Sequence, residues 1–480
     1  MKRYFNFGFK PLQLSISVAA PAIMWIVPVP QGLNADGWHL LAIFVGTILA
    51  IITEAVPMGV AAMSAVAFTA VSGILAPGNP GEGINLALSG FSNSVIWLIV
   101  LAFFISRGFV KTGLGKRIAY IFVRFFGKRT LGLSYSLLFA DLILSPAIPS
   151  NTARGGGIIF PIIKSLSNEF KSNPADGTEK KLGTFLITAA FQGNIITSTM
   201  FMTAMAANPL AAKLASQVGI EMTWTTWAVA ALVPGIISLI IVPLAVYFLC
   251  PPEIKATPGA AEIAHRKLRE LGPLSGAEIV MTICFVMLLT LWIAGPHIGV
   301  NATVAALLGL LLLLYSGILS WDDIKSEKGA WDTLVWFAAL VMMAGFLNKL
   351  GVISWFGTII KHDLTGISPS IAFPLLILIY VYIHYFFASS TAHVAALFPV
   401  FLGTGVALGL NGLLLALALG FASNLCASIT HYSCGPAPVF FGSGYVKLKT
   451  WWLVGLAVSI INMLIWYGIG PVYWKALGLG

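Results

Sequence analysis

The sequence predicts an all-α polytopic membrane protein, an inverted repeat of about 11 transmembrane helices with two re-entrant helical hairpins. Of the 480 residues, 58% are hydrophobic and only 9% are charged, whereas soluble domains carry about 25% charged residues. The apolar residues form runs of roughly 18 or more, the length that crosses a bilayer. So little polar surface cannot face water, and therefore lipid must surround most of the chain.

The apolar runs define the elements in order. Each is bounded by turn-forming or charged residues, and no polar stretch between them is long enough to bury a core of its own. The run nearest the N-terminus ends in Val27-Pro28-Val29-Pro30 without a small-residue cleavage site, so it is a span and not a signal peptide. The predicted spans are 12–30, 38–54, 57–76, 93–110, 182–207, 227–249, 279–295, 302–319, 332–350, 411–430 and 451–472.

Two further apolar stretches, 131–165 and 369–404, are too long for one span. A small polar cluster interrupts each of them, Ser145–Thr152 in the first and Ser389–Thr391 in the second. A backbone break in lipid leaves amides and carbonyls unpaired, which is tolerated only inside protein or beside a watery cavity. We therefore expect two re-entrant hairpins whose tips meet near the middle of the membrane.

The positive charges predict the orientation. With the N-terminus inside, 22 of the 27 Lys and Arg residues fall in cytoplasmic segments and 4 fall outside. The positive-inside rule then favours a multi-pass protein of the bacterial inner (cytoplasmic) membrane with a cytoplasmic N-terminus. Because the charges lie in short loops, the net charge of +10 does not indicate nucleic-acid binding. The four cysteines form no CxxC pair, so we expect neither disulfides nor a metal site.

The two halves of the chain resemble each other. Trp97 and Trp336 lie 239 residues apart, and Ser150 and Ser389 share this offset. The first copy starts inside and the second starts outside, so the repeat is inverted. Secondary transporters are built this way, with substrate held at the midplane between discontinuous helices. Further matches are Gly108–Lys111 with Gly345–Asn348, and Phe191–Asn194 with Phe421–Asn424.

At these motifs the sequence resembles the divalent anion:sodium symporter family, and especially its bacterial citrate/succinate and tartrate/succinate antiporters and plastid 2-oxoglutarate/malate translocators. The resemblance covers nearly the whole chain. It implies an elevator-type transporter of di- and tricarboxylates, working as a homodimer in which a transport domain moves against a scaffold. The motifs that carry it are Thr53–Pro57, Pro149–Pro161, Ser389–Thr391, Thr430–Pro438 and Phe441–Gly444.

On this resemblance the chain divides into five regions. The first repeat has scaffold spans over 1–130 and a transport-domain hairpin and broken helix over 131–210. Linking and scaffold spans follow over 211–368. The second hairpin and broken helix occupy 369–445, and a C-terminal span occupies 446–480.

The hairpin tips are the predicted substrate site. Ser150 and Ser389 open the two tips with hydroxyls, and the N-termini of the following half-helices favour anions. The resemblance places substrate carboxylates on Asn151 and Thr152, and on Ser390 and Thr391. It also implicates breaks in the fifth and tenth spans near Asn194 and Gly435-Pro436. The alternative is that these Ser and Thr residues only cap helices or bond across them.

Arg154 and His393 mark a departure from the sodium-coupled members, as does Ser390, which stands where those members carry Asn. Arg154 follows the serine of the first tip at the same distance as His393 follows the serine of the second. A charged guanidinium inside a membrane is energetically costly unless it is paired. We expect Arg154, helped by His393, to supply the positive charge that sodium supplies elsewhere, which favours sodium-independent exchange. Alternatively, Arg154 pairs with Asp141 as a structural element. His431, beside the tenth-span break, is a further candidate substrate contact.

The rival functions differ in the residues they need. An enzyme needs a nucleophile with a base or metal ligands at helical spacing, and neither HExxH nor GxSxG occurs. No catalytic residue and no cofactor is therefore predicted, and bound sodium is not favoured. A passive channel does not need two mirrored hairpins. The remaining alternatives are a sodium-coupled dicarboxylate symporter and a carrier of another oxyanion on the same frame.

Overall fold

The computed structural model describes residues 9–363 and 368–479. Within these ranges the chain is helical, with one isolated β-bridge between Arg129 and Ala256 and no strand. Lys2 and Arg3, which contribute to the predicted positive side, lie outside the described residues, as do positions 364–367 at the border of two predicted regions.

The described residues of the first half form eleven α-helices. A π-helical turn over Gly155–Ile159 joins α8 to α9, so that residues 151–169 form one continuous helical run. The helices are α1 (Pro11–Ile26), α2 (Ala35–Ile52), α3 (Met58–Val71), α4 (Pro80–Ala87), α5 (Ser94–Thr112), α6 (Leu114–Phe126), α7 (Thr130–Leu144), α8 (Asn151–Arg154), α9 (Phe160–Glu169), α10 (Gly183–Met200) and α11 (Ala207–Ser216).

The described residues of the second half form thirteen more α-helices. A 3-10 turn over Ile383–Phe386 extends α19, and a π-helical turn over Ile465–Ile469 joins the last two helices. They are α12 (Trp224–Leu249), α13 (Pro258–Leu271), α14 (Gly276–Ile298), α15 (Ala302–Tyr315), α16 (Trp321–Ser326), α17 (Lys328–Lys349), α18 (Val352–Asp363), α19 (Pro369–Tyr382), α20 (Ser390–Ala407), α21 (Gly412–Leu425), α22 (Pro436–Phe441), α23 (Leu448–Leu464) and α24 (Gly470–Ala476).

Eight helical segments in the described residues are long and apolar enough to cross a membrane, and five shorter apolar helices accompany them. The prediction of an all-α polytopic membrane protein is therefore confirmed. The predicted span 182–207 differs most: α10 ends at Met200, and almost all of its residues are buried in protein. Because protein and not lipid surrounds α10, it can carry polar residues such as Gln192 and Asn194.

Both predicted hairpins are present, and serine determines where each second arm begins. The chain leaves the helical path after Leu144 and re-enters it after Ser150, whose Oγ accepts a hydrogen bond from the N–H of Ala153 (3.1 Å). In the second hairpin, Ser389 Oγ accepts from the N–H of Ala392 (3.3 Å). Serine is a favoured N-cap because its oxygen satisfies a backbone donor that the helix leaves free.

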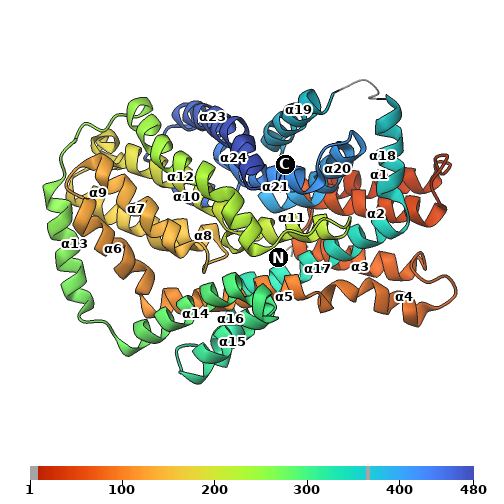
Figure 1. Cartoon of the computed structure of the whole chain (residues 1–480), viewed down its shortest axis with the longest axis horizontal. Coiled ribbons are helices and arrows are strands. Elements are labelled where there is room, and N and C mark those ends of the chain that lie inside the picture. Colours follow the sequence, from red (N-terminus) through yellow and green to blue (C-terminus); the bar gives the residue numbers. More distant parts are fainter. Residues whose placement is uncertain (1–8, 364–367, 480) are drawn as a thin grey trace, which may run out of the picture.

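The helices form two packed groups. In one, α17 packs against α2, α3 and α5, and α5 packs against α14 and α15. In the other, α10 packs against α7, α12 and α21, while α20 and α11 pack against α21. Figure 1 places α7, α9, α10 and α12 at one end of the long axis and α1 to α4 at the other, with α11, α17 and α21 between them. The division into scaffold and transport regions, and their relative movement, stay predictions.

Candidate functional site

The first hairpin tip faces the break that follows α10. Asn151 is buried, its Oδ1 accepts from the N–H of Thr152 (3.0 Å), and its Nδ2 lies 3.5 Å from Met205 Sδ. Met205 belongs to the segment 201–206, which contains only one short 3-10 turn. The first break therefore lies after α10. Asn194, near which the resemblance implied a break, sits inside the helix about two turns before its end.

Arg154 lies fully buried below this tip, with four of its five N–H donors bonded to protein. Its Nε donates to Asp141 Oδ1 (3.1 Å), and one terminal nitrogen donates to the Ser198 hydroxyl (2.7 Å). The other terminal nitrogen donates to the carbonyl oxygens of Ile148 (2.5 Å) and Ala204 (2.6 Å). The guanidinium thus ties the two arms of the hairpin to the break after α10. This geometry favours the structural alternative for Arg154 over direct contact with substrate.

Asp141 completes a neutral network around this arginine. Its second oxygen accepts hydrogen bonds from Asn194 Nδ2 (3.0 Å) and from the hydroxyl of Thr197. Asp141 is buried, so the pair with Arg154 brings no net charge to the tip. Asn194 therefore acts on the tip through Asp141, while its own Oδ1 is buried without a hydrogen-bond partner in the described structure.

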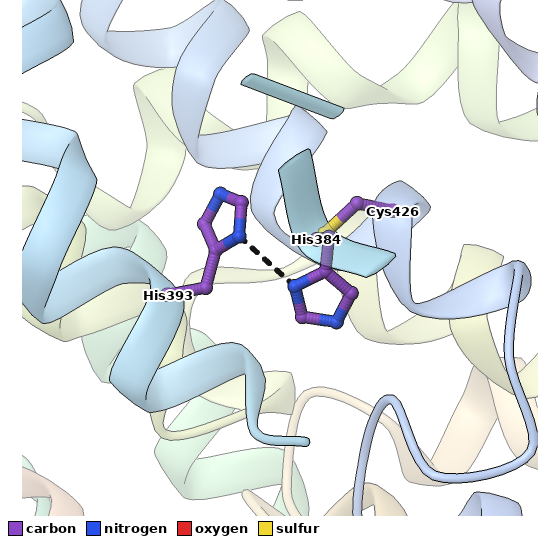
Figure 2. A group of neighbouring side chains, drawn as sticks. All are labelled: His384, His393 and Cys426. Carbon is purple, nitrogen blue, oxygen red and sulfur yellow. Dashed lines mark hydrogen bonds between the residues drawn. The ribbon is translucent and has the colours of Figure 1, made fainter. Parts of the chain in front are cut away.

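The second tip is held by two histidines. His384 and His393, on either side of the tip, share a hydrogen bond between their Nδ1 atoms (2.9 Å), as Figure 2 shows. His384 Nε2 lies 3.0 Å from the carbonyl oxygen of Ser433. Ser390 is buried, and its hydroxyl has no partner in the described structure, while Thr391 is half-buried. His384 was not among the predicted site residues, because nothing in the sequence shows that it faces His393.

The segment Ser433–Pro436 connects the two tips. It ends the break after α21, and α22 begins at Pro436. Ser433 bonds to the second tip through His384, and Gly435 lies against the first, where a Cβ would collide with the Thr152 hydroxyl oxygen. Glycine is required there because the backbone approaches Thr152 so closely. No hydrogen bond between described residues joins the tips directly, so they meet through this segment.

His431 points away from this arrangement. Its Nδ1 accepts a hydrogen bond from Trp452 Nε1 (3.2 Å), and its ring lies against Phe441 and Tyr432. None of the contacts in the described structure joins His431 to either tip. Its predicted substrate contact is therefore not supported by this geometry.

A cavity of about 540 Å³ lies between the second tip and the first helices of the chain. Ser389 and Ala392 line one side, and the connection between α2 and α3 lines the other. Lys10 and Glu54 border it and form an ion pair (3.1 Å), with Glu54 in the left-handed backbone region at φ 49°. The volume suits a small organic ligand. Sequence reasoning counted Lys10 only as a loop charge.

Three side chains near the second tip lie close enough together to be considered as a metal site. His384, His393 and Cys426 each offer a donor atom, and these atoms lie within 4.8 Å of one another. Figure 2 shows that the two imidazole nitrogens facing each other are already joined by their hydrogen bond. Cys426 Sγ donates instead to the carbonyl oxygen of Ser423 (3.3 Å), so it is not bonded to either imidazole in this structure.

The repeat offset relates the two networks. Asp141 and Tyr380 lie 239 residues apart, as do Arg154 and His393. Tyr380 packs edge-on against His393, with ring centres 4.3 Å apart, and bonds to the Ser423 hydroxyl (2.8 Å). The first half thus holds a charged pair where the second half holds an uncharged aromatic one. Two helical hairpins whose tips lie against the breaks of the following helices are typical of secondary transporters.

Comparison with known proteins identifies the family. Residues 10–479 match the family described as "Sodium:sulfate symporter transmembrane region", and the chain belongs to this family of membrane transporters. It is a transporter and not an enzyme. The resemblance to divalent anion:sodium symporters is thereby confirmed.

The relatives span nearly the whole chain. YflS of Bacillus subtilis, named for malate transport, is 58% identical over 98% of this chain and 97% of its own. Dicarboxylate transporter 1 of Arabidopsis thaliana chloroplasts is 47% identical over 98% of this chain and 84% of its own. The inner membrane protein YbhI of Escherichia coli is 36% identical over 97% of both chains. The solved YdaH transporter of Alcanivorax borkumensis shares the fold, with a TM-score of 0.51, 15% identity and coverage of 98% and 97%.

Proposed function

We propose that this protein exchanges di- and tricarboxylates of the malate, succinate, citrate, tartrate and 2-oxoglutarate class by a sodium-independent elevator mechanism. It works in the bacterial inner membrane as a homodimer with its N-terminus in the cytoplasm. The observation that carries the proposal is the convergence of both hairpin tips on Ser433–Pro436. The names of YflS and of the chloroplast transporter support dicarboxylates as the substrate class.

The tips offer what two carboxylates need. Donors come from the Asn151 amide, from the hydroxyls of Thr152, Ser390 and Thr391, and from free backbone N–H groups at the start of α20. Ser150 and Ser389 support these donors indirectly, because their oxygens cap the helices that present them. Burying a carboxylate without such partners would be prohibitive.

Sodium independence is supported by one residue of the second tip. Ser390 stands where the sodium-dependent members that the sequence resembles carry an amide. Arg154 cannot replace the charge of sodium directly while Asp141 neutralises it. Sodium-coupled symport is the second candidate. It is favoured by buried oxygens without partners in the described structure, Asn194 Oδ1, Asn424 Oδ1 and Thr430 Oγ1, because hard cations prefer oxygen ligands.

Counterflow in proteoliposomes tests the proposal. Vesicles preloaded with succinate should accumulate radiolabelled malate equally well with and without sodium, and empty vesicles should not. Uptake into empty vesicles that requires sodium would establish symport instead. Competition by each acid of the class ranks the substrates.

A site variant makes the test specific. Asn151→Ala should reduce exchange by about tenfold or more, since a lost hydrogen bond to a charged group is worth about 1.5–3 kcal/mol. The matched control is Asn301→Ala, which removes only a helix cap at the start of α15. Equal losses in both variants would contradict a substrate role for the tip.

A further inference from the structure

The two histidines of the second hairpin form a directional hydrogen-bonded chain. It runs from the Ser433 carbonyl to His384 and from there to His393, and Figure 2 shows the bond between the two histidines. A carbonyl oxygen can only accept, so His384 carries its hydrogen on Nε2 and its Nδ1 is an acceptor. The hydrogen between the rings is therefore on Nδ1 of His393. The second nitrogen of His393, Nε2, is then a bare basic site.

This nitrogen is buried and has no hydrogen-bond partner in the described structure. An unpaired buried acceptor is unfavourable and is normally satisfied. A proton is the smallest species that can occupy it, and imidazole binds protons near neutral pH. The pair as it stands holds one hydrogen on each ring and can accept one more.

The surroundings keep the empty pair uncharged. Tyr380 of α19 lies edge-on to His393, and Phe387 lies 5.1 Å from it between ring centres. Cys426, after α21, is the other titratable group facing the pair. Among the described residues no Asp, Glu, Lys or Arg side chain bonds to either ring. A proton there would leave an unbalanced charge in an apolar setting, which burial disfavours.

An anion at the tip would supply the missing balance. His393 lies in the first turn of α20, where its backbone N–H bonds to the Ser389 carbonyl (3.0 Å). The cation of the first half, Arg154, is already balanced by Asp141. The second half has the uncharged Tyr380 at the position equivalent to Asp141. The charge of the histidine pair can therefore change when a substrate arrives.

We propose that the His384–His393 pair binds one proton at His393 Nε2 when a dicarboxylate occupies the tips, so that a proton travels with the anion. The proton comes from solvent and adds to the nitrogen lone pair without breaking a covalent bond. This inference rests on the proposed dicarboxylate site. It makes the second hairpin a proton site of the carrier.

Calorimetry of malate binding to the purified full-length protein tests this. At pH 7.5 malate is a dianion in solution, so proton uptake comes from the protein. Titrations in phosphate and in Tris, which differ in ionisation enthalpy, should give heats that correspond to close to one proton taken up per malate. Between pH 6.5 and 8.5 the affinity should fall by well over tenfold, since uptake of one proton per malate lowers it about tenfold per pH unit. Equal heats in both buffers, or an affinity independent of pH, would overturn the proposal.

The variants locate the proton. His393→Asn and His384→Asn should each abolish the buffer dependence, and the control His297→Asn, an exposed residue of α14, should keep it. A buffer dependence that survives in both pair variants would also overturn the proposal. If one variant fails to fold, the other and the wild-type pH series still decide. Failure of the wild type to bind any dicarboxylate would instead contradict the proposed function.

Discussion

At the scale of single residues, the buried pair of Arg154 and Asp141 governs the first tip. Every oxygen of Asp141 and four donors of Arg154 are bonded inside the protein. Removal of one partner leaves an uncompensated buried charge, which costs about 3–5 kcal/mol, whereas removal of both is often tolerated. The pair therefore positions the tip by holding both arms and the following break together.

Arg154→Met should accordingly destabilise the protein by about 3–5 kcal/mol. The double variant Arg154→Met with Asp141→Asn should regain most of this stability and bind malate within a few-fold of wild type. Thermal unfolding in detergent and calorimetry measure the two quantities. Arg266→Met is the control, because its pair with Glu169 is exposed and worth at most about 1 kcal/mol. Recovered stability without recovered affinity would return Arg154 to a direct role in substrate binding.

The sequence was sufficient to locate both tips but not to define their chemistry. Small polar clusters inside apolar runs predicted both breaks, and capping by serine was the alternative to substrate binding. Ser150 and Ser389 do cap the following helices in the structure. The partner of Arg154 lies 13 residues earlier, on the opposite arm of the hairpin. Only tertiary packing brings Asp141, and in the second tip His384, to these positions, so the choice between a substrate contact and a structural pair stayed open.

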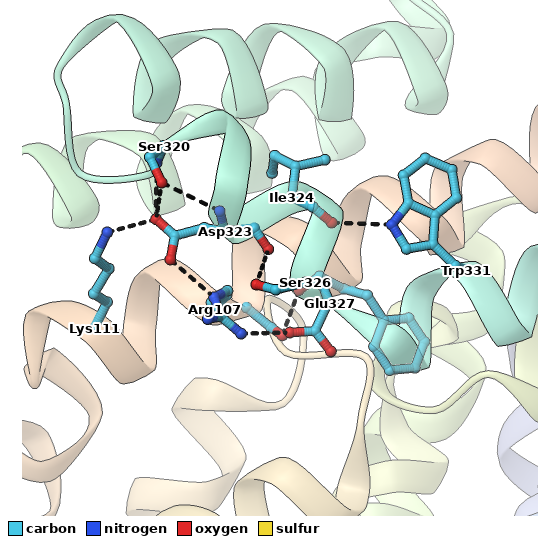
Figure 3. A network of polar contacts seen from close by, with 10 residues as sticks. Arg107, Lys111, Ser320, Asp323, Ile324, Ser326, Glu327 and Trp331 are labelled. Atoms are coloured by element: carbon cyan, nitrogen blue, oxygen red, sulfur yellow. Dashed lines mark hydrogen bonds and ion pairs between the residues drawn. The ribbon is translucent and has the colours of Figure 1, made fainter.

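At the scale of elements, the short helix α16 ties the two halves of the chain together. Figure 3 shows Asp323 receiving hydrogen bonds from Lys111 (2.5 Å) and Arg107 (3.2 Å) of α5. Asp323 also closes a capping box with Ser320, and Arg107 reaches Glu327 (3.3 Å). The sequence predicted only a charged cytoplasmic connection here. Its capping signal is local, but the partners on α5 are more than 200 residues away, beyond the reach of pattern analysis.

Asp323→Asn should lower the stability of the protein by about 1–3 kcal/mol. Hydrogen bonding to the Lys111 ammonium, followed by the Ser320 backbone, holds the pKa of Asp323 well below its usual range. A lowered folded-state pKa contributes stability that is present above the unfolded value of about 3.9 and is lost as pH falls below it. The Tm difference from wild type should therefore be constant from pH 8 to about 5 and shrink towards pH 3.

The neighbouring Asp322→Asn is the matched control for this helix. Asp322 is 85% exposed and pairs only with Lys325, in the next turn of the same helix (2.6 Å). Its removal should change Tm little at any pH, since exposed pairs contribute at most about 1 kcal/mol. A Tm difference for Asp323→Asn that persisted unchanged at pH 3 would show that its charge is not the cause.

At the scale of the whole molecule, the cavity beside the second tip lies between that tip and the connection from α2 to α3. Ala388 on the tip and Val56 on the α2–α3 connection both line it. An elevator requires these two surfaces to slide past each other during every transport cycle. The family resemblance implied a scaffold and a transport region, but this cavity follows from how the halves pack, which no sequence motif encodes.

Cross-linking of these surfaces should therefore arrest transport. With cysteines at Val56 and Ala388, a flexible bifunctional maleimide should reduce malate counterflow in proteoliposomes by about tenfold or more, while each single variant stays active. All four native cysteines are buried, so they should react little. The control pair, Ala22→Cys and Thr47→Cys, lines a groove between α1 and α2 within one group, and linking it should leave exchange intact. Undiminished exchange by a fully cross-linked Val56–Ala388 protein would mean that the tip does not move against α2 and α3, because a covalent tie across a sliding surface must stop it.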